Sequence, residues 1–153
     1  PMGGCRNQVT PDALVPEMCE DGRMRHKYQT LMKGMDVFSF GITTAPKSIK
    51  KLAKEYELNI DNVDYFIFHQ ANRKMNEFIR NKLKIAEEKV PYSMTHFGNT
   101  SSASIPLTIV TQIADQVSEG NKELIACGFG VGLSWGTLHF KLDHPVISKL
   151  VEL

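Results

Sequence analysis

The sequence predicts an α/β protein in which a layered mixed sheet carries helices on both faces. Amphipathic segments of helical period alternate with short apolar runs rich in aromatic and β-branched residues, a pattern typical of strands covered on both sides. The chain has 153 residues, of which 42% are hydrophobic and 23% charged, so it can bury a core. The predicted order is helix, strand, helix, strand, helix, strand, strand.

The first predicted helix begins at Thr43 or Thr44, either of which could cap it, and ends near Glu57. Pro46 then falls in the first turn, where its missing N–H is tolerated. The first strand is predicted over residues 62–68, because this run is almost continuously apolar and mostly aromatic or β-branched.

The second helix is predicted over residues 72–84, with one apolar arc formed by Met75, Phe78, Ile79 and Leu83. A short strand over residues 90–93 follows. The third helix carries Pro106 in its first turn, ends near Gly120, and has a buried stripe of Ile109, Val110, Ile113 and Val117.

The last two strands are predicted over residues 123–127 and 133–140, antiparallel and joined by a tight turn with the sequence GFGVG. The first thirty residues carry Gly and Pro at short intervals without a sustained period, so residues 1–30 are predicted to be an irregular lead. The folded domain is expected over residues 31–140, and residues 141–153 form a C-terminal extension.

Composition excludes several classes of protein. Eighteen Lys and Arg against seventeen Asp and Glu give a formal charge of +1, which removes the whole-chain argument for a nucleic-acid binder. No apolar run approaches the roughly 18 to 20 residues of a membrane span, and no signal peptide opens the chain. The start at Pro1, without Met, suggests that an upstream segment has been removed.

The cysteines and histidines match no metal-binding or disulfide pattern. Cys5, Cys19 and Cys127 are an odd number at wide spacings, which favours a reducing, cytoplasmic location. The five histidines form no HxxxH or HExxH pair, so no metal site is expected.

Three loops lie where an α/β sheet gathers its ligands, beyond the carboxyl ends of strands. They are HQAN (69–72), GNTSSAS (98–104) and GFGVG (128–132). Each has an ordinary structural interpretation: a strand-capping histidine, a set of N-cap residues and a plain hairpin. However, His69 and Asn99 stand one αβ unit apart, so both fall at the same edge of the sheet.

In this order and spacing, HQAN, GNTSSASIP and GFGVGLSWG resemble the C-terminal half of β-ketoacyl-acyl carrier protein synthase III, in the thiolase superfamily. MKGMDVFSF, residues 32–40, is similar to the segment before the first helix of that half. The resemblance covers residues 31–140 approximately. It implies a thiolase-like fold and decarboxylative Claisen condensation of an acyl-CoA starter with malonyl-acyl carrier protein in fatty acid biosynthesis.

On this resemblance, His69 and Asn99 are catalytic, donating hydrogen bonds to the malonyl thioester oxygen as negative charge develops there. Phe129 would border the cavity. The backbone N–H of Val131, where the family often has glycine, would join the oxyanion hole. No cofactor is implied, because coenzyme A and phosphopantetheine thioesters enter as substrates.

The resemblance also implies binding residues. Asn72 would contact the pantetheine arm, with Gly34 and Phe38 near its entrance. The second helix holds five bases against the single acid Glu77, and the residues expected to dock an acidic carrier protein are Arg73, Lys74 and Arg80.

None of the three cysteines sits at a strand-to-helix junction, where this family carries its nucleophile. The expected partners are therefore the protein's own N-terminal half, acyl carrier protein and acyl-CoA, with a homodimer in the full-length enzyme, no nucleic acid and no membrane span. Alone, the chain is expected to be inactive. The alternatives are a non-catalytic domain that binds carrier protein or coenzyme A, and a related synthase of specialised polyketide metabolism. Hydroxymethylglutaryl-CoA synthase and chalcone synthase-like chemistry are disfavoured by HQAN together with GNTSSAS.

Overall fold

The computed structural model describes residues 9–29, 32–130 and 132–151. It divides the chain into two compact units, Pro1–Met35 and Asp36–Leu153. Among the described residues, no helix is both long and apolar enough to cross a membrane.

The first unit contains a short hairpin. Strand β1 (Glu17–Met18) pairs antiparallel with β2 (Met24–Arg25), and a 3₁₀ turn (Pro11–Leu14) precedes them. Asp21 and Arg25 form an ion pair of 2.5 Å across the connecting turn. The described part of this segment therefore has more regular structure than the irregular lead that the sequence predicts.

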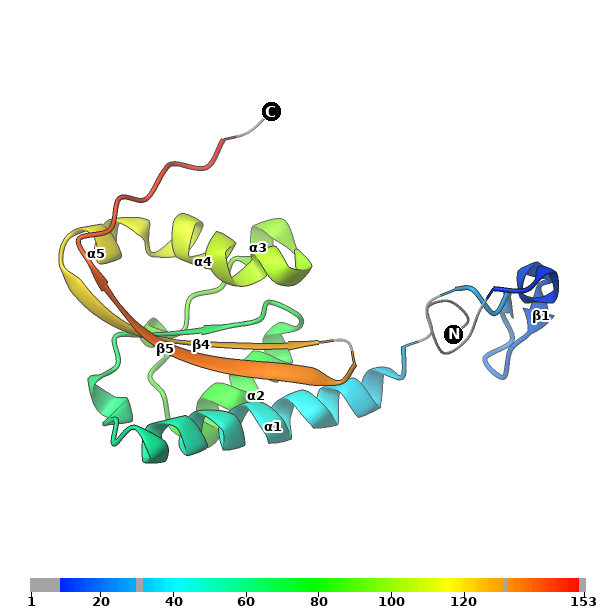
Figure 1. Ribbon diagram of the computed structural model, residues 1–153, viewed down its shortest axis with the longest axis horizontal. Helices are drawn as coiled ribbons and strands as arrows, with labels where there is room; N and C mark the ends of the chain where they lie inside the picture. Colours follow the sequence, from blue (N-terminus) through cyan, green and yellow to red (C-terminus); the bar gives the residue numbers. More distant parts are fainter. Residues whose placement is uncertain (1–8, 30–31, 131, 152–153) are drawn as a thin grey trace. The chain divides into compact units, whose positions relative to one another are not determined.

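The second unit is built on a three-stranded mixed sheet (Figure 1). Strand β3 (Tyr65–Phe68) runs parallel to the central strand β4 (Asn121–Gly130), which in turn pairs antiparallel with β5 (Ser134–Asp143). Because parallel strands need a crossover, the chain between β3 and β4 is long and carries most of the helices.

Helices cover both faces of this sheet (Figure 1). On one face lie α1 and α2, and on the other lie α4 and α5, with the single-turn α3 before them. Their bounds are α1 (Gly34–Glu55), α2 (Arg73–Leu83), α3 (Met94–Phe97), α4 (Ser104–Gln112) and α5 (Ala114–Ser118). The layered mixed sheet predicted from the sequence is confirmed.

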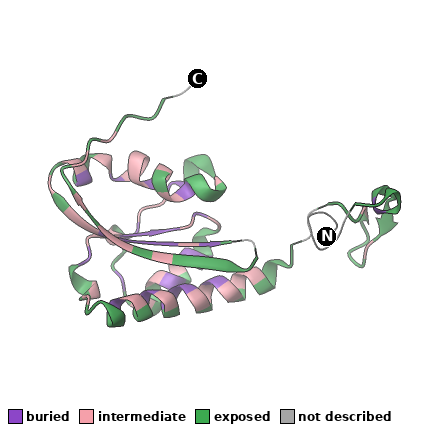
Figure 2. Ribbon diagram, in the orientation of Figure 1, coloured by how far each residue is buried: buried purple, intermediate pink, exposed green. Residues whose placement is uncertain are grey.

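The sheet interior is buried on both sides, as Figure 2 shows in purple. Phe66 and Phe68 of β3 are fully buried against α1 and α2, whereas Ile67 between them is fully buried on the other face. Strand β4 alternates in the same way, with Ile125 on the first face and Leu124 on the second. This explains why both strands are almost continuously apolar in sequence.

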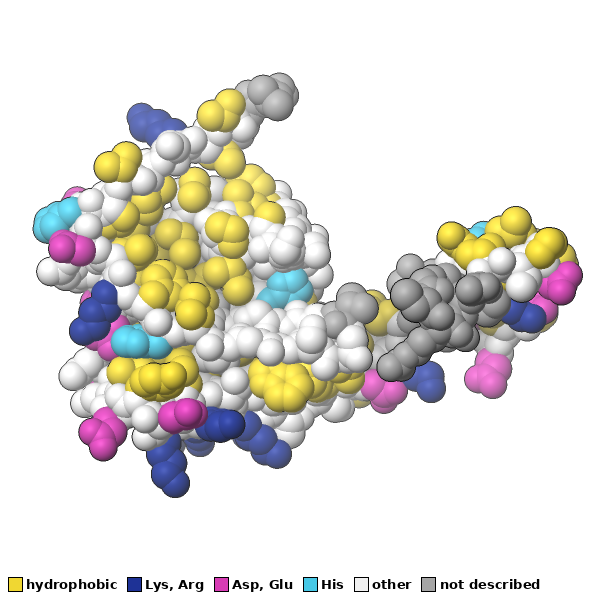
Figure 3. Space-filling model, viewed as in Figure 1, with side chains coloured by type: hydrophobic (Ala, Val, Ile, Leu, Met, Phe, Trp, Pro, Cys, Tyr) yellow, Lys and Arg dark blue, Asp and Glu magenta, His cyan; other side chains and the backbone are white. Residues whose placement is uncertain are grey.

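Strand β5 is covered less completely. Figure 3 shows hydrophobic side chains gathered over the face between α4, α5 and β5. Leu138 of β5 pairs with Ala126, yet Leu138 is 60% exposed and Ala126 only 7%. The core of this face is thus centred on β4.

Helix α1 begins about ten residues before the predicted Thr43 or Thr44 cap, so that prediction is wrong. Pro46 lies in the helix interior, where it removes the N–H that would bond the carbonyl of Ile42. Lys82 of α2 supplies a substitute, because its Nζ donates to that carbonyl at 3.4 Å. A contact from another helix therefore partly offsets the hydrogen bond that Pro46 removes.

Two further element predictions are wrong. Residues 90–93 form no strand, because the backbone N–H of Ser93 donates to Oε1 of Gln70 at 3.1 Å rather than to a neighbouring strand. The GFGVG segment is not itself the turn. Its first three residues continue β4, with Gly128, Phe129 and Gly130 opposite Gly136, Trp135 and Ser134.

The predictions for the second and third helices agree better with the structure. Helix α2 lies within the predicted 72–84, with Asn72 as its N-cap, and Pro106 lies in the first turn of α4 as expected. The predicted third helix is interrupted at Ile113, which ends α4 and precedes α5. In the predicted arc of α2, Phe78 is 59% exposed and packs edge-on against Phe38 at 5.8 Å between ring centroids.

Two phenylalanines provide a matched test of this core. Phe66→Ala is expected to lower the free energy of unfolding by about 3–5 kcal/mol, because it leaves a cavity at a fully buried position. Phe78→Ala should cost less than about 1.5 kcal/mol, since it removes mainly one aromatic contact. Urea denaturation with linear extrapolation measures both, and equal losses would contradict the described packing.

Candidate functional site

The parallel pairing of β3 with β4 brings two predicted site residues together. His69 directly follows β3, and its backbone N–H donates to the carbonyl of Cys127 at 2.9 Å. The His69 ring packs edge-on against Phe129, with 5.4 Å between ring centroids. Phe129 is 8% exposed, so it forms an apolar wall beside the imidazole.

A second contact holds the His69 ring from α4. Nδ1 of His69 lies 2.8 Å from Oγ of Ser104, which is fully buried as the first residue of that helix. Burial lowers the pKa of His69 below its ordinary 6.5. The imidazole is therefore neutral near about pH 7, and one of its ring nitrogens is an N–H donor.

The loop that carries Asn99 leads directly into Ser104. Asn99 is exposed, and its Oδ1 accepts a hydrogen bond from the backbone N–H of Ser101 at 2.9 Å. This bond orients the side-chain amide, and within the described ranges its Nδ2 has no hydrogen-bond partner. The two predicted catalytic residues are thus linked through one short loop that ends on the His69 ring.

The polar residues of this loop do not cap α4 as the structural interpretation of the sequence expected. The N-cap position is Ala103, without a side-chain hydrogen bond. Ser101 has a φ of 54°, a left-handed conformation that costs energy in a residue other than glycine. The Asn99 and Ser104 side chains therefore bond to the Ser101 backbone and to the His69 ring rather than capping α4.

Next to His69 in the chain is a buried amide, Gln70, which the sequence alone did not indicate as a site residue. Gln70 is fully buried, and its Nε2 donates to the carbonyl of Phe68 at 2.8 Å. Its Oε1 accepts the backbone N–H groups of Ser93 and Met94 at 3.1 and 3.3 Å. Gln70 thereby joins the end of β3 to the start of α3.

Further buried polar side chains surround Gln70. Together they form a polar layer made of Gln70, Asn76, Ser93, Ser104 and Thr108. Thr108 donates to the carbonyl of Ser104 at 2.7 Å and lies 2.7 Å from Oγ of Ser93. Nδ2 of Asn76 donates to the carbonyl of His69 at 3.2 Å. Ser104 and Thr108 are four residues apart, a spacing that could have indicated a shared helix face. It could not have indicated the contact between Ser104 and His69.

The basic residues predicted on α2 differ in their surroundings. Arg73 and Lys74 are exposed at the start of the helix, and the Arg73 guanidinium lies 5.1 Å from the centroid of the Tyr92 ring. Asn72, just before them, accepts the backbone N–H of Met75 at 3.3 Å as the helix cap. Its predicted contact with pantetheine stays a prediction.

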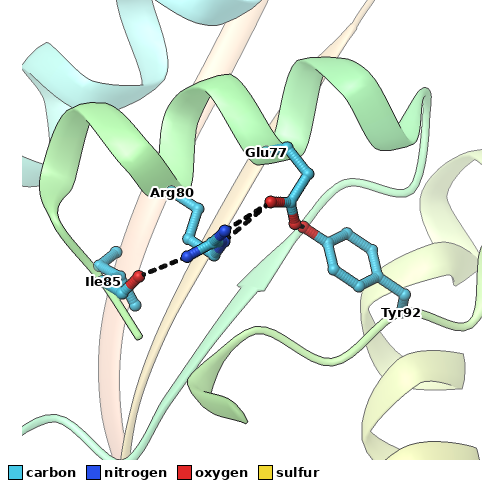
Figure 4. Close-up of polar contacts among 4 residues, drawn as sticks. All are labelled: Glu77, Arg80, Ile85 and Tyr92. Atoms are coloured by element: carbon cyan, nitrogen blue, oxygen red, sulfur yellow. Dashed lines mark hydrogen bonds and ion pairs between the residues drawn. The ribbon is translucent and has the colours of Figure 1, made fainter. Parts of the chain in front are cut away.

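Arg80 is already bound within the protein (Figure 4). Its guanidinium donates to Glu77 at 2.7 Å and to the carbonyl of Ile85 at 3.0 Å. Tyr92 donates to the other Glu77 oxygen at 2.5 Å. The Arg80 hydrogen bond, with that of Tyr92, lowers the pKa of Glu77, while burial and Glu77 raise the pKa of Tyr92. The predicted role of Arg80 in docking a carrier protein stays a prediction.

The remaining predicted site residues are more scattered. Gly34 is the first residue of α1, and Phe38 lies one turn later against Phe78. Val131 lies outside the described residues. Within the described ranges, no group of three or more His, Cys, Asp or Glu residues could hold a metal ion.

Cys127 does not have the surroundings of a nucleophile. Cys127 is fully buried in β4, and its Sγ accepts a hydrogen bond from Thr137 at 3.4 Å. Burial raises the pKa of the Cys127 thiol, which disfavours the reactive thiolate. Cys19 belongs to the first unit, and Cys5 lies outside the described residues.

Comparison with known proteins identifies the family. The sequence model described as 3-oxoacyl-[acyl-carrier-protein] synthase III C terminal matches residues 53–142, the segment that contains His69, Asn99 and Phe129. This chain belongs to that family. The resemblance inferred from the three motifs is therefore confirmed.

Curated synthase III relatives support the assignment. The β-ketoacyl-[acyl-carrier-protein] synthase III of Streptococcus gordonii is 39% identical over 115 residues, covering 73% of this chain and 35% of the relative. That of Porphyra umbilicalis is 32% identical over 148 residues, covering 82% and 45%. The chain thus spans less than half the length of these synthases.

Solved structures of related synthases share the fold. A crystal structure of a 3-oxoacyl-(acyl-carrier-protein) synthase III superposes with a TM-score of 0.81 at 33% identity, covering 90% of this chain and 41% of that one. The 3-oxoacyl-(acyl-carrier-protein) synthase of Burkholderia xenovorans gives 0.75 at 33% identity, covering 78% and 35%. The priming β-ketosynthase of the R1128 polyketide pathway gives 0.65 at 26% identity, covering 75% and 35%. The thiolase-like expectation for the fold is confirmed.

The burial of His69 has a measurable effect on stability. The folded pKa of His69 lies below 6.5 and the unfolded pKa is about 6.5, so between these values the unfolded state binds more protons. The free energy of unfolding should therefore fall as pH falls through this window and lose this dependence above it. His69→Gln should remove that part of the slope in denaturation curves recorded across the range. An unchanged slope would contradict the lowered pKa.

Proposed function

We propose that this chain is the C-terminal catalytic part of a 3-oxoacyl-[acyl-carrier-protein] synthase III, which condenses an acyl-CoA starter with malonyl-acyl carrier protein in fatty acid biosynthesis. The observation that carries the proposal is the His69 site. A neutral imidazole follows β3, packs against Phe129 and lies within the segment that matches the family. A neutral donor at this place suits the stabilisation of a developing oxyanion.

The proposed chemistry begins with decarboxylation. The bond between the malonyl carboxylate carbon and the α-carbon breaks, carbon dioxide leaves, and the electron pair forms an enolate whose charge rests on the thioester oxygen. N–H groups of His69 and Asn99 donate to that oxygen. Neither donor gives up its proton, so both remain ready for the next cycle.

The carbon–carbon bond forms in the second step. The enolate carbon attacks the carbonyl of an acyl group held as a cysteine thioester, and the thiolate leaves. The nucleophile is proposed to come from a second part of the enzyme, because the chain spans 35% to 45% of the curated relatives above and Cys127 is buried. A homodimeric, cytoplasmic enzyme is part of the same proposal.

Arg73 and Lys74 are proposed to contact the acyl carrier protein. Both are exposed beside Asn72, at the end of α2 nearest His69 in sequence. A carrier protein docked there would deliver its phosphopantetheine arm past Asn72 toward the site. Of the three bases predicted for docking, these two are not occupied by an internal carboxylate as Arg80 is.

A second candidate is a priming synthase of polyketide metabolism. It is favoured by the structural likeness to the R1128 priming β-ketosynthase. The two candidates share the His69 and Asn99 chemistry and differ in the acyl starter. Measuring acyl-CoA preference in the complete enzyme separates them.

The catalytic assignment is tested in the complete synthase by His69→Ala and Asn99→Ala. Each should lower the rate of malonyl decarboxylation roughly 10²- to 10³-fold, because each removes one donor to the enolate oxygen. Acyl loading from acyl-CoA onto the cysteine should remain largely intact, as measured by mass spectrometry of the acyl-enzyme. Equal loss of loading in both variants would rule out this division of roles.

The docking assignment is tested by reversing charge at Lys74. Lys74→Glu should raise KM for malonyl-acyl carrier protein roughly 3- to 10-fold at low salt, and less at high salt where the charges are screened. Activity with malonyl-CoA should change little. Lys50→Glu, at an exposed lysine on α1, is the matched control, and an equal effect there would argue against a docking site on α2.

A further inference from the structure

The hydroxyl groups around His69 have one consistent set of hydrogen-bond directions. Thr108 donates its proton to the carbonyl of Ser104 at 2.7 Å. The Thr108 oxygen must then accept from Ser93, whose Oγ lies 2.7 Å away. Each hydroxyl has one proton to donate, so this chain runs from Ser93 through Thr108 to the backbone of Ser104.

The proton of the Ser104 hydroxyl has one destination. Oγ of Ser104 already accepts the backbone N–H of Gln70 at 3.3 Å. Among the residues that the structure describes, the only acceptor within hydrogen-bond distance of this hydroxyl is Nδ1 of His69, at 2.8 Å. Because Ser104 is fully buried, directing the proton elsewhere would leave a buried donor unpaired.

The surroundings of the ring favour its neutral form. Phe129 packs against it edge-on, and burial lowers its pKa. None of the ion pairs among the described residues involves His69. A neutral imidazole that accepts at Nδ1 carries its proton on Nε2.

We propose that Ser104 is a positioning residue, which holds His69 in the tautomer that is protonated on Nε2 and so makes Nε2 the donor toward the reacting oxygen. The inference rests on the proposed function and extends it to a residue that does not touch substrate. With the opposite tautomer, Nε2 would present a lone pair to the enolate oxygen and repel it. Ser104 therefore determines whether the His69 site attracts or repels negative charge.

The first measurement uses the unsubstituted chain. Histidine labelled with a nitrogen isotope allows long-range proton–nitrogen correlation spectra at about pH 8, well above the ordinary histidine pKa of about 6.5. His69→Gln assigns the signals of His69. The expected spectrum shows an unprotonated Nδ1 and a protonated Nε2, and the reverse pattern would overturn the proposal.

The second measurement compares Ser104→Ala with Ser93→Ala. Both remove a buried hydroxyl of the same network, but only Ser104 contacts the ring. Ser104→Ala should give a mixture of tautomers, and Ser93→Ala should keep the original one. If Ser104→Ala retains the Nε2–H tautomer alone, the proposal is wrong.

The kinetic test in the complete synthase separates this inference from the proposed function. Ser104→Ala should lower kcat for malonyl decarboxylation roughly 3- to 10-fold, the range of one hydrogen bond, with KM unchanged. Ser93→Ala should have a smaller effect. If Ser104→Ala decarboxylates at the unchanged rate while His69→Ala is slowed, the positioning role is overturned. If His69→Ala also decarboxylates normally, the proposed function fails, while an Nε2–H tautomer in the spectra still supports the assignment of the Ser104 proton.

Discussion

The parallel pairing of β3 with β4 is the contact on which the second unit depends. It sets Phe68 opposite Cys127, and His69, the next residue, packs its ring against Phe129 of β4. The same pairing requires a long crossover, which supplies α2 on one face of the sheet and α4 and α5 on the other, while α1 precedes β3. A slip by one residue would exchange the two faces of β3 and move buried phenylalanines away from α1 and α2.

The polar layer under His69 shows how such a site can be built inside a core. Gln70, Asn76, Ser93, Ser104 and Thr108 are all at most 1% exposed. Buried polar groups are costly unless they are hydrogen-bonded, and each of these five makes at least one bond to a neighbouring segment. Ser93 belongs to this layer and lies in residues 90–93, where the sequence predicted a strand that the structure does not contain. The bonds of the layer tie three separate segments to the end of β3.

The sequence allowed prediction of those features that depend on local pattern or on motif. Helical period and apolar runs located α2 and β3 closely and the middle of β4, and the three motifs identified the family. Helix α1 was placed too late, because Pro46 looks like a helix start when the compensating contact from Lys82 is unknown. Ser104 was missed for a similar reason. Its contact with His69 joins residues 35 positions apart, and no periodicity in one sequence encodes such a distance.

The continuation of β4 through Gly130 affects how the site could change. Phe129 is held in the ladder opposite Trp135, so the backbone of this wall cannot shift without breaking the pairing of β4 with β5. A wall fixed in this way resists adjustment to ligands of different size. Relatives that accept bulkier groups at this side of the imidazole would need a different side chain at position 129, whereas a loop at the same place could have adapted by motion alone.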